Sequence, residues 1–448
     1  MKKVSVIAAA VAATLAAGPV LAVDFYGYVR SGIGLSGDAG ENLGYEKSKV
    51  GRLGNENDTF FEVGLGQELY NQDGVSFYLD SLIAHAVDGD NDWEESPSAL
   101  RVINVQAKGL IKSDKDATMW VGKRYYQRRD VHITDFYYLN TSSGAGVGVE
   151  NLSLGNGKLS TALITDEGSQ QGDATYGYIA ANNKATGATD PNQVWAQTGY
   201  DSSDVQAYIA DIRYSGINLW ENANLELAGA YNFAHETKGQ TAVADDGMLL
   251  SAIVHQGLDN GFNQTVFQYG SNSYAAQMPG LGGGNNYDRS TDANNGADGF
   301  RILNWGVVGL GESWEVGHQI MYASASDVGT AASYKNNYDK TTGAYTGDTV
   351  VAGKKFDHTL ANVVVRPTYK WDNNMKTIFE AGYFTEEKDN VDSAGSKFTV
   401  AQAWGAGSSF WARPEIRLYA SYFNDHEGEF DSGNDSEFSV GAQFEAWW

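Results

Sequence analysis

The sequence predicts a single antiparallel β-barrel that spans a membrane. Three observations lead to this all-β fold class: an export signal at the N-terminus, segments in which apolar and polar residues alternate strictly, and a composition with 53 glycines but only six prolines. Strict alternation is typical of β-strands, because successive side chains point to opposite faces. Low proline with many glycines and tyrosines suits many strands joined by polar loops.

The first 22 residues are typical of a secretory signal peptide. The basic pair Lys2-Lys3 precedes an apolar run from Val4 to Leu15, and Val20-Leu21-Ala22 resembles a cleavage site. A membrane anchor is the alternative, but the position of the run and the cleavage pattern favour a signal peptide. We expect cleavage after residue 22. Residues 23–448 show no linker and no change of composition, so we expect one barrel domain there.

The composition excludes several classes of protein. Removing the signal peptide leaves 29 of the 31 Lys and Arg residues against 56 Asp and Glu residues. Such an acidic chain does not suit nucleic acid, because a phosphate backbone needs clustered basic residues. The chain has no cysteine, so disulfides and thiolate metal sites are excluded, and its seven histidines show no metal-ligand spacing. Its 11 Trp, 26 Tyr and 18 Phe residues argue against disorder.

The alternation is clearest in three segments. From Val23 to Ile33 the odd-numbered residues suit lipid and the even-numbered ones suit water, and Asp58–Leu69 repeats this pattern. The third segment, Glu437–Trp448, ends the chain on an aromatic residue, as in bacterial outer-membrane barrels. A soluble β-sandwich would also alternate. Segments of about 9–11 residues, with aromatics near their ends at Trp371 and Tyr422-Phe423, favour a membrane barrel.

Short and long connections separate these segments. Asn71–Gly74 and Asp372–Asn374 are short turns, whereas Asp166–Asn192 and Gln277–Ala297 are long polar stretches that we interpret as external loops. Short turns on one side and long loops on the other are typical of outer-membrane barrels. Within the second stretch, Gly280–Asn285 lacks the last glycine of a dinucleotide-binding motif and is interpreted as a flexible external loop.

Several runs of residues closely resemble the maltoporin family of outer-membrane sugar channels. They are Val23–Gly34, Arg52–Glu56, Asn91–Glu94, Gly122–His132, Asp135–Tyr138, Arg366–Trp371 and Trp447-Trp448. The resemblance is strongest over residues 23–160 and again from about residue 360. It implies an 18-stranded antiparallel barrel with long external loops and one loop folded into the pore, assembled as a homotrimer. One departure is Asn57, which stands where some family members have a cysteine.

The resemblance also implies a row of aromatic residues along the lumen, on which sugar rings slide. Aromatic rings can stack on the apolar faces of a glucosyl ring, while charged groups bind its hydroxyl rim. Strand parity independently places Tyr28, Phe60, Phe262 and Trp447 on polar faces, whereas Trp371 precedes a turn and Trp93 lies in a polar loop and would lean into a neighbouring subunit. The expected slide residues are Tyr28, Phe60, Trp93, Phe262, Trp371 and Trp447.

A track of polar residues would flank the slide. Two further residues would lie near the constriction, which residues 128–137 would form as a loop folded into the barrel. The expected polar residues are Arg30, Arg52, Glu62, Arg101, Arg128 and Asp130, with Asp135 and Tyr137 at the constriction. According to the resemblance, the family's sucrose-specific members differ in this constriction region and carry a coiled-coil extension before the barrel. This sequence keeps Arg101, Asp130 and Tyr137 and shows no such extension, which favours maltodextrin over sucrose.

We therefore expect passive diffusion of maltose and maltodextrins through the outer membrane, with no catalytic residue, metal or cofactor. The expected partners are the sugars, outer-membrane lipid and two further copies of the chain, and the external loops would be accessible to phage. Four alternatives stay open: a sucrose or other oligosaccharide porin, a general diffusion porin, a glycosidase, which needs only two carboxylates, and a lectin-like surface barrel.

Overall fold

The computed structural model describes residues 22–37, 43–87, 98–142, 144–180, 193–234, 244–289, 291–338 and 345–448. Within these ranges the side chains of residues 167–180, 193–206, 333–338 and 345–350 are not described. Residues 1–21 of the predicted signal peptide, and Trp93 of the predicted slide, lie outside the described residues.

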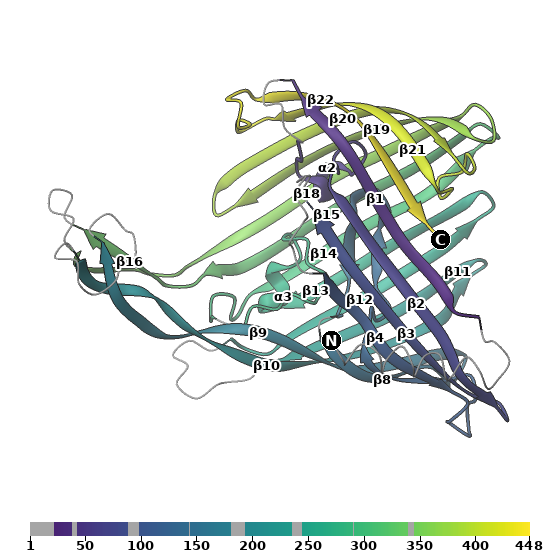
Figure 1. Cartoon of the computed structure of the whole chain (residues 1–448), viewed down its shortest axis with the longest axis horizontal. Helices are drawn as coiled ribbons and strands as arrows, with labels where there is room; N and C mark the ends of the chain where they lie inside the picture. Colours follow the sequence, from purple (N-terminus) through teal and green to yellow (C-terminus); the bar gives the residue numbers. More distant parts are fainter. Residues whose placement is uncertain are drawn as a thin grey trace, which may run out of the picture.

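Eighteen strands of the described chain form one closed antiparallel barrel (Figure 1). Each strand pairs with its neighbour along the barrel, and β1 pairs with both β2 and β22, so the sheet has no free edge. The strands are β1 (Asp24–Ser36), β2 (Thr59–Gln72), β3 (Val75–Val87), β4 (Ala99–Lys108), β5 (Thr118–Lys123), β8 (Ala145–Leu154), β9 (Gly157–Ala180), β10 (Gln193–Trp220), β11 (Ala223–Phe233), β12 (Gly247–Leu258), β13 (Gly261–Ser271), β14 (Asp298–Leu310), β15 (Trp314–Thr330), β18 (Lys354–Lys370), β19 (Met375–Lys388), β20 (Val391–Gly405), β21 (Glu415–Asp425) and β22 (Ser436–Trp447). The predicted fold class is confirmed.

The other elements are short and belong to connections between barrel strands. They are α2 (Lys47–Val50), β6 (Arg129–Val131), the 3-10 turn η1 (His132–Thr134), β7 (Phe136–Leu139), α3 (Ser273–Ala276), β16 (Ser333–Tyr338) and β17 (Tyr345–Val351). Over the described ranges, every helix is too short or too polar to cross a bilayer.

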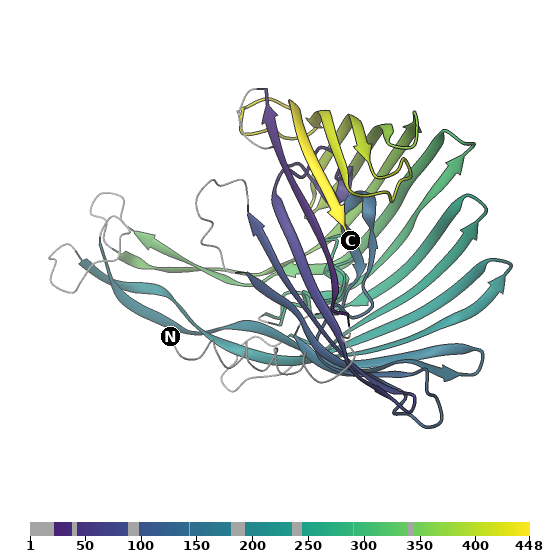
Figure 2. The same ribbon diagram turned by 45° about the vertical axis from the view of Figure 1, so that its right-hand side comes forward.

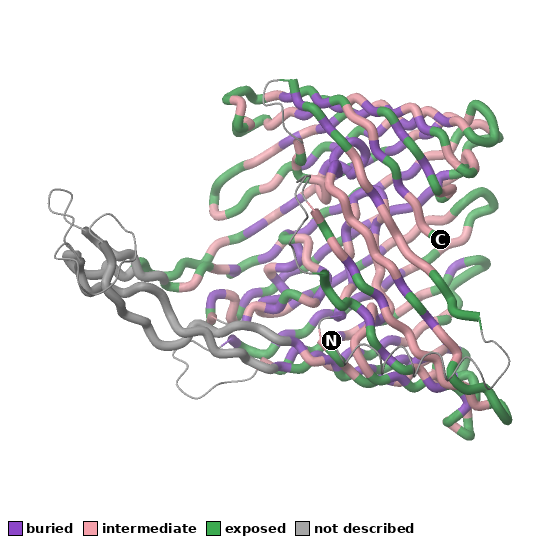
Figure 3. Tube along the Cα trace, in the orientation of Figure 1, coloured by how far each residue is buried: buried purple, intermediate pink, exposed green. Residues whose placement is uncertain are grey.

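The outer face of the barrel is apolar and the inner face is polar, as the alternation predicts. Along β1, the outward Phe25 and Ile33 are 59% and 61% exposed, whereas the inward Arg30 is only 9% exposed. Along β22, Phe438 points outward and Glu445 is buried inside. Figure 3 shows this alternation of buried and exposed positions along the strands. An exposed apolar band over a closed barrel is the surface that a lipid bilayer covers.

The long connections gather at one end of the barrel, where β9 and β10 project well beyond the rim (Figures 1 and 2). The sequence interpretation of Asp166–Asn192 as a loop is wrong for its first half, because β9 continues to Ala180 and pairs with β10. Thr175, Tyr176, Tyr178 and Ile179 favour strands, so this segment extends the ladder although it lies among polar residues.

Three connections fold back into the barrel and fill much of its interior. The loop between β5 and β8 contributes Ile133 and Phe136 to the main apolar cluster, α2 contributes Val50, and the connection after β13 contributes Tyr274 and Met278. They pack on the inner side chains of β12–β15 and β18. The in-folded loop predicted for residues 128–137 is therefore present, and it leaves a narrow passage beside the wall made by β1–β4.

The segment Gly280–Asn285 is not the free external loop that its glycines suggest. The backbone amide of Asn140 donates a hydrogen bond to the Gly283 carbonyl oxygen at 2.7 Å, and Gly283 is buried. A Cβ at Gly283 would lie 2.5 Å from the carbonyl oxygen of Tyr137. Glycine is thus needed here for close approach of two backbones, and the segment braces the in-folded loop.

Candidate functional site

A cavity of about 610 Å³ lies in the lumen between the wall made by β1–β4 and β22 and the in-folded loop. It brings together three of the six expected slide residues and all eight expected polar residues. These eleven lining residues are Tyr28, Arg30, Arg52, Phe60, Glu62, Arg101, Arg128, Asp130, Asp135, Tyr137 and Trp447. Of the other three, Phe262 and Trp371 lie elsewhere in the structure, and Trp93 is outside the described residues.

Strand register places the aromatic members of this cavity side by side. In the ladders around β1, Tyr28 lies opposite Glu62 of β2 and opposite Trp447 of β22, and Arg30 lies opposite Phe60. All five are inward-facing positions of their strands, since side chains alternate with a period of two. The closure of the barrel between the first and last strands therefore builds this part of the site.

The hydroxyl group of Tyr28 links two charged residues and orients the ring. It donates to Glu445 Oε1 at 2.8 Å and accepts from Arg52 Nη2 at 2.8 Å. The rings of Tyr28 and Phe60 follow one another with centroids 6.0 Å apart, and the Arg30 guanidinium lies 5.0 Å from the Phe60 ring centroid. The result is an aromatic surface with charged groups directly beside it.

The charged residues beside the aromatic surface are paired. Arg30 donates to both carboxylate oxygens of Asp58, at 2.9 and 2.8 Å, and Arg52 Nε donates to Glu56 Oε2 at 2.7 Å. Burial by itself would raise the pKa of Glu56, but the nearby cations Arg52, Lys47 and Arg30 outweigh burial and lower this pKa to about 2. The carboxylate of Glu56 is therefore charged at any physiological pH.

In the in-folded loop, the guanidinium group of Arg128 lies between two tyrosine rings. Its central carbon is 3.3 Å from the ring centroid of Tyr125 and 4.6 Å from that of Tyr137. The Tyr125 hydroxyl donates to Glu62 Oε1 at 2.6 Å and accepts from Arg101 Nε at 3.1 Å. Tyr125 thus connects three of the expected polar residues, although sequence reasoning did not single it out.

A β-bulge aims Arg101 into the lumen. The pairing of β3 with β4 shifts by one residue between Leu82 opposite Val102 and Ile83 opposite Leu100, which leaves Arg101 as the extra residue. An extra residue in one strand of a ladder can re-aim a side chain. Arg101 reaches Tyr125 for this reason, although the neighbouring Val102 also points inward and is buried.

Two aspartates of the in-folded loop lie close to one another. Burial, followed by the nearby charge of Asp135, raises the pKa of Asp130, whereas Arg128 and Arg52 act in the opposite direction. Asp135 accepts a hydrogen bond from Lys47 Nζ at 2.7 Å. Lys47 belongs to the first loop and was not among the residues expected from the sequence.

A second aromatic group continues the path from Trp447. His132 lies with its ring centroid 5.9 Å from that of Trp447 and 5.2 Å from that of Trp411. Trp411 in turn stacks on Phe262, with centroids 6.5 Å apart and an interplanar angle of 28°. Phe262 also packs edge-on against Trp305 at 4.9 Å. Ring contacts therefore run from Phe60 through Tyr28, and onward from Trp447 to Phe262.

Trp371 does not join this path. Its indole Nε1 donates to Thr377 Oγ1 at 2.8 Å, and its ring packs edge-on against Tyr369, which contacts Trp314. Thr377, Tyr369 and Trp314 all have the outward parity of their strands, and Trp371 is 58% exposed. The structure thus puts Trp371 in an aromatic girdle on the outer face, so the expectation that it lines the lumen is wrong.

Trp411, which the sequence analysis did not single out, lies between the His132–Trp447 pair and Phe262. It lies in the turn between β20 and β21, where strand parity has no meaning. The backbone amide of Phe410 donates to Glu315 Oε2 at 2.8 Å, and Arg413 lies over the Trp447 ring at 4.4 Å. These contacts turn the segment inward. The one sequence feature that could have indicated Trp411 is the adjacent pair Phe410-Trp411. Two adjacent aromatic residues suit an outer aromatic girdle as well as a lumen site.

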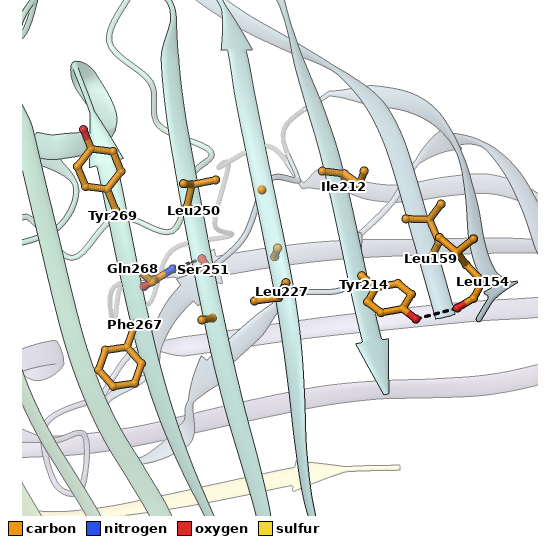
Figure 4. Close-up of a pocket in the computed structure, with 13 residues that line it drawn as sticks. Leu154, Leu159, Ile212, Tyr214, Leu227, Leu250, Ser251, Phe267, Gln268 and Tyr269 are labelled. Carbon is orange, nitrogen blue, oxygen red and sulfur yellow. Dashed lines mark hydrogen bonds between the residues drawn. The ribbon is translucent and has the colours of Figure 1, made fainter. Parts of the chain in front are cut away.

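A second hollow of about 610 Å³ has a different character (Figure 4). It lies across β8–β13 and is lined by outward-facing apolar side chains such as Leu227, Leu250 and Phe267, each more than 40% exposed. It therefore belongs to the lipid-facing band, and it contains none of the predicted site residues.

Comparisons with known proteins agree with this geometry. The model of the LamB porin family matches residues 23–448. A maltoporin of Vibrio cholerae serotype O1 is 49% identical over 460 residues, which cover 100% of both chains. A maltoporin of Photobacterium profundum is 47% identical, covering 95% of this chain and 94% of its own length, and one of Hahella chejuensis is 38% identical, covering 100% and 98%. The chain belongs to the LamB porin family.

Proposed function

We propose that the protein is a passive, sugar-selective channel through which maltose and maltodextrins diffuse across the bacterial outer membrane. The observation that carries the proposal is the inward row of aromatic rings, flanked on one side by paired arginines and carboxylates. Aromatic faces and ionised groups are the two surfaces that a glucosyl ring requires, one for its apolar faces and one for its hydroxyl rim.

The path consists of several similar contacts instead of one deep site. Phe60 and Tyr28 follow one another at 6.0 Å, and Trp411 and Phe262 at 6.5 Å. A sugar chain can therefore leave one ring as it meets the next. Channels conduct when binding is favourable enough to enter but weak and repeated enough to leave. This spacing supports facilitated diffusion over tight binding.

The proposed sugar path comprises five aromatic residues in the described chain, and Trp93 from the expected set. The polar residues are those predicted from the sequence. In full, the path is Tyr28, Phe60, Trp93, Phe262, Trp411 and Trp447, flanked by Arg30, Arg52, Glu62, Arg101, Arg128, Asp130, Asp135 and Tyr137. Trp371 is left out because its ring lies on the outer face.

The protein is an outer-membrane barrel and belongs to a family of channels. We infer that residues 1–22 are removed on export, that residues 23–448 are one domain and that three copies assemble. N-terminal sequencing of the membrane-extracted protein should begin at Val23. In detergent without heating, the protein should migrate near three times the mass of the mature chain, and a monomer band would contradict the trimer.

Permeation through proteoliposomes tests the proposed function and separates it from its alternatives. Liposomes loaded with protein should admit maltose and maltotriose faster than sucrose, relative to their rates of free diffusion. Equal relative rates would indicate a general diffusion porin, and faster sucrose entry a sucrose-type porin. Maltodextrin recovered from the same liposomes should show no new reducing ends, whereas a glycosidase would release them.

A further inference from the structure

The first loop reaches into the constriction through one lysine. Lys47, in the short helix α2, places its Nζ 2.7 Å from Glu56 Oε1 and 2.7 Å from Asp135 Oδ2. Glu56 belongs to the same loop, whereas Asp135 lies 88 residues further on in the loop that narrows the pore. Lys47 is therefore a direct link between the first loop and the constriction.

Lys47 shares both of its partner atoms with Arg30. The Arg30 Nη1 lies 3.4 Å from Glu56 Oε1 and 3.7 Å from Asp135 Oδ2, the same two oxygens that Lys47 contacts. These distances are longer because Arg30 is already committed to Asp58 through two hydrogen bonds. Lys47 is thus the closer cation for Asp135, and Arg30 faces the same oxygens only with its Nη1, while its Nε and Nη2 bind Asp58.

The charge balance at the constriction depends on this lysine. Without Lys47, the nearest cation to Asp135 would be Arg30 at 3.7 Å, with Arg52 acting from further away, and the charge of Asp135 already raises the pKa of the neighbouring Asp130. Like charges at close range repel, so the aspartate would move toward water in the lumen. The Lys47 side chain is itself 29% exposed, and it lines a separate cavity of about 360 Å³ that shares Arg30 with the lumen cavity. Its charge therefore lies directly beside the passage.

We propose that Lys47 is a positioning and selectivity residue of the channel, which holds Asp135 at the constriction and lowers the preference of the pore for cations. This inference rests on the proposed channel function. Its structural basis is the juxtaposition of one ammonium group with two carboxylates from two different loops.

The fold supplies a matched control in the same helix. Lys49 Nζ pairs with Glu386 Oε2 of β19 at 2.6 Å and with Glu46 Oε2 at 3.1 Å, on the side of α2 that faces the barrel wall. Replacing Lys49 removes the same charge from the same loop without touching Asp135. The backbone amide of Arg52 also donates to the Ile133 carbonyl at 3.0 Å, so the two loops stay joined in either variant.

The test compares K47M, K47R and K49M in planar bilayers with wild-type protein. K47M should weaken block by maltohexaose by about two- to fivefold, the range of a partly exposed ion pair. Its reversal potential in a potassium chloride gradient should shift toward cation selectivity. K47R should restore most of both properties, and K49M should stay near wild type. If K47M folds poorly, K47Q is measured in its place.

A double variant shows whether Lys47 acts through Asp135. In a D135N background, K47M should change sugar block by less than half the factor seen in wild type, because its partner charge is gone. The proposal would be overturned if K47M matched wild type in both sugar block and reversal potential, or if K47M and K49M changed these two properties equally. A shifted reversal potential with unchanged sugar block would overturn the positioning role. Failure of the wild-type channel to respond to maltohexaose would instead contradict the proposed function.

Discussion

Tyr28 shows how a single residue would prepare the proposed path for sugar. Its hydroxyl is held between Arg52 and Glu445 by two hydrogen bonds of 2.8 Å, so its ring needs no reorientation when a ligand arrives. An aromatic ring that is ordered before the ligand binds loses little conformational freedom on binding. Arg52 and Glu445 are buried and also pair directly at 3.1 Å, which keeps the arrangement rigid.

Two substitutions separate the ring of Tyr28 from its hydroxyl. Tyr28→Ala should weaken maltohexaose block by about fivefold, the value of one aromatic contact of ~1 kcal/mol, and should leave ion conductance largely intact. Tyr28→Phe should retain most of the affinity, since the neighbouring Phe60 offers a stacking surface for sugar without a hydroxyl. Conductance noise in a maltohexaose titration measures the sugar affinity of both variants. Equal affinity in the alanine and wild-type proteins would remove Tyr28 from the path.

Trp371, which the family resemblance placed in the slide, and Trp411, which the sequence analysis did not single out, give a second test. Trp411→Ala should weaken maltohexaose block by about fivefold, because its ring lies between His132 and Phe262. Trp371→Ala should leave block unchanged, because its ring packs on Tyr369 on the outer face. The reverse result would restore Trp371 to the lumen and remove Trp411 from the path.

For single residues, the sequence predicts which way a side chain points only where the residue lies in a regular strand. Tyr28, Phe60 and Trp447 lie within regular strands, where alternation determines which face a side chain occupies. Trp371 and Trp411 lie in turns, where backbone direction depends on contacts from distant residues such as Glu315. Lys47 was missed for the same reason, because its partner Asp135 becomes a neighbour only when both loops fold inward.

Among the elements, the in-folded loop is the one that we expect to set the width of the passage. Its Arg128 is held between Tyr125 and Tyr137, and a planar guanidinium group stacks well on aromatic faces. The loop is supported from the wall by Arg366, whose Nη2 donates to the Ile133 carbonyl at 3.2 Å, and by Gln319, which accepts from Thr134 at 2.6 Å. This support from β15 and β18 allows the loop to present a fixed side-chain set to the pore.

Tyr137→Ala should widen this passage. The change removes one of the two rings that hold Arg128, so single-channel conductance should rise and maltohexaose block should weaken. Tyr137→Phe is the control, since it keeps the ring and should stay near wild-type conductance. If alanine lowers the conductance or leaves it unchanged, Tyr137 does not limit the passage.

The first loop should lose its anchoring in acid. Glu56 has an ordinary pKa of 4.5 and a pKa of about 2 in the folded protein, so the unfolded chain binds more protons between these values. Its contribution to stability is therefore complete above about pH 4.5 and is lost as the pH falls through about 2. The unfolding temperature of wild-type protein in detergent should exceed that of E56Q at pH 7, and the difference should shrink below pH 4.5. A difference that is constant down to pH 2 would contradict this account.

Some strands and loops could be predicted from the sequence and others could not. The strands β1, β2 and β22 could be read from alternation, and the in-folded loop from its resemblance to a family. The length of β9 was missed, because the strand-favouring residues of its second half lie among polar ones and the segment is held as a strand by pairing with β10. The bulge that turns Arg101 inward leaves no mark in the sequence, since any residue can occupy such a position.

For the whole molecule, closure of the barrel explains how the proposed path is assembled. The first and last strands meet, so residues more than 400 positions apart, such as Tyr28 and Trp447, become register partners. Alternation alone predicted a barrel with an apolar outside, which the exposed Phe25 and Ile33 confirm. It did not predict eighteen strands, because the number of strands depends on pairings between distant segments; that number came from the family resemblance.

The most direct test of the central claim, a maltodextrin-selective channel, is planar-bilayer conductance of the purified protein titrated in turn with maltohexaose, sucrose and glucose. The aromatic and polar path predicts saturable block, with maltohexaose effective at much lower concentration than sucrose and with glucose weakest, because a longer chain contacts more rings at once. Stable conductance that none of the three sugars blocks would contradict the account and reduce the protein to a general diffusion pore.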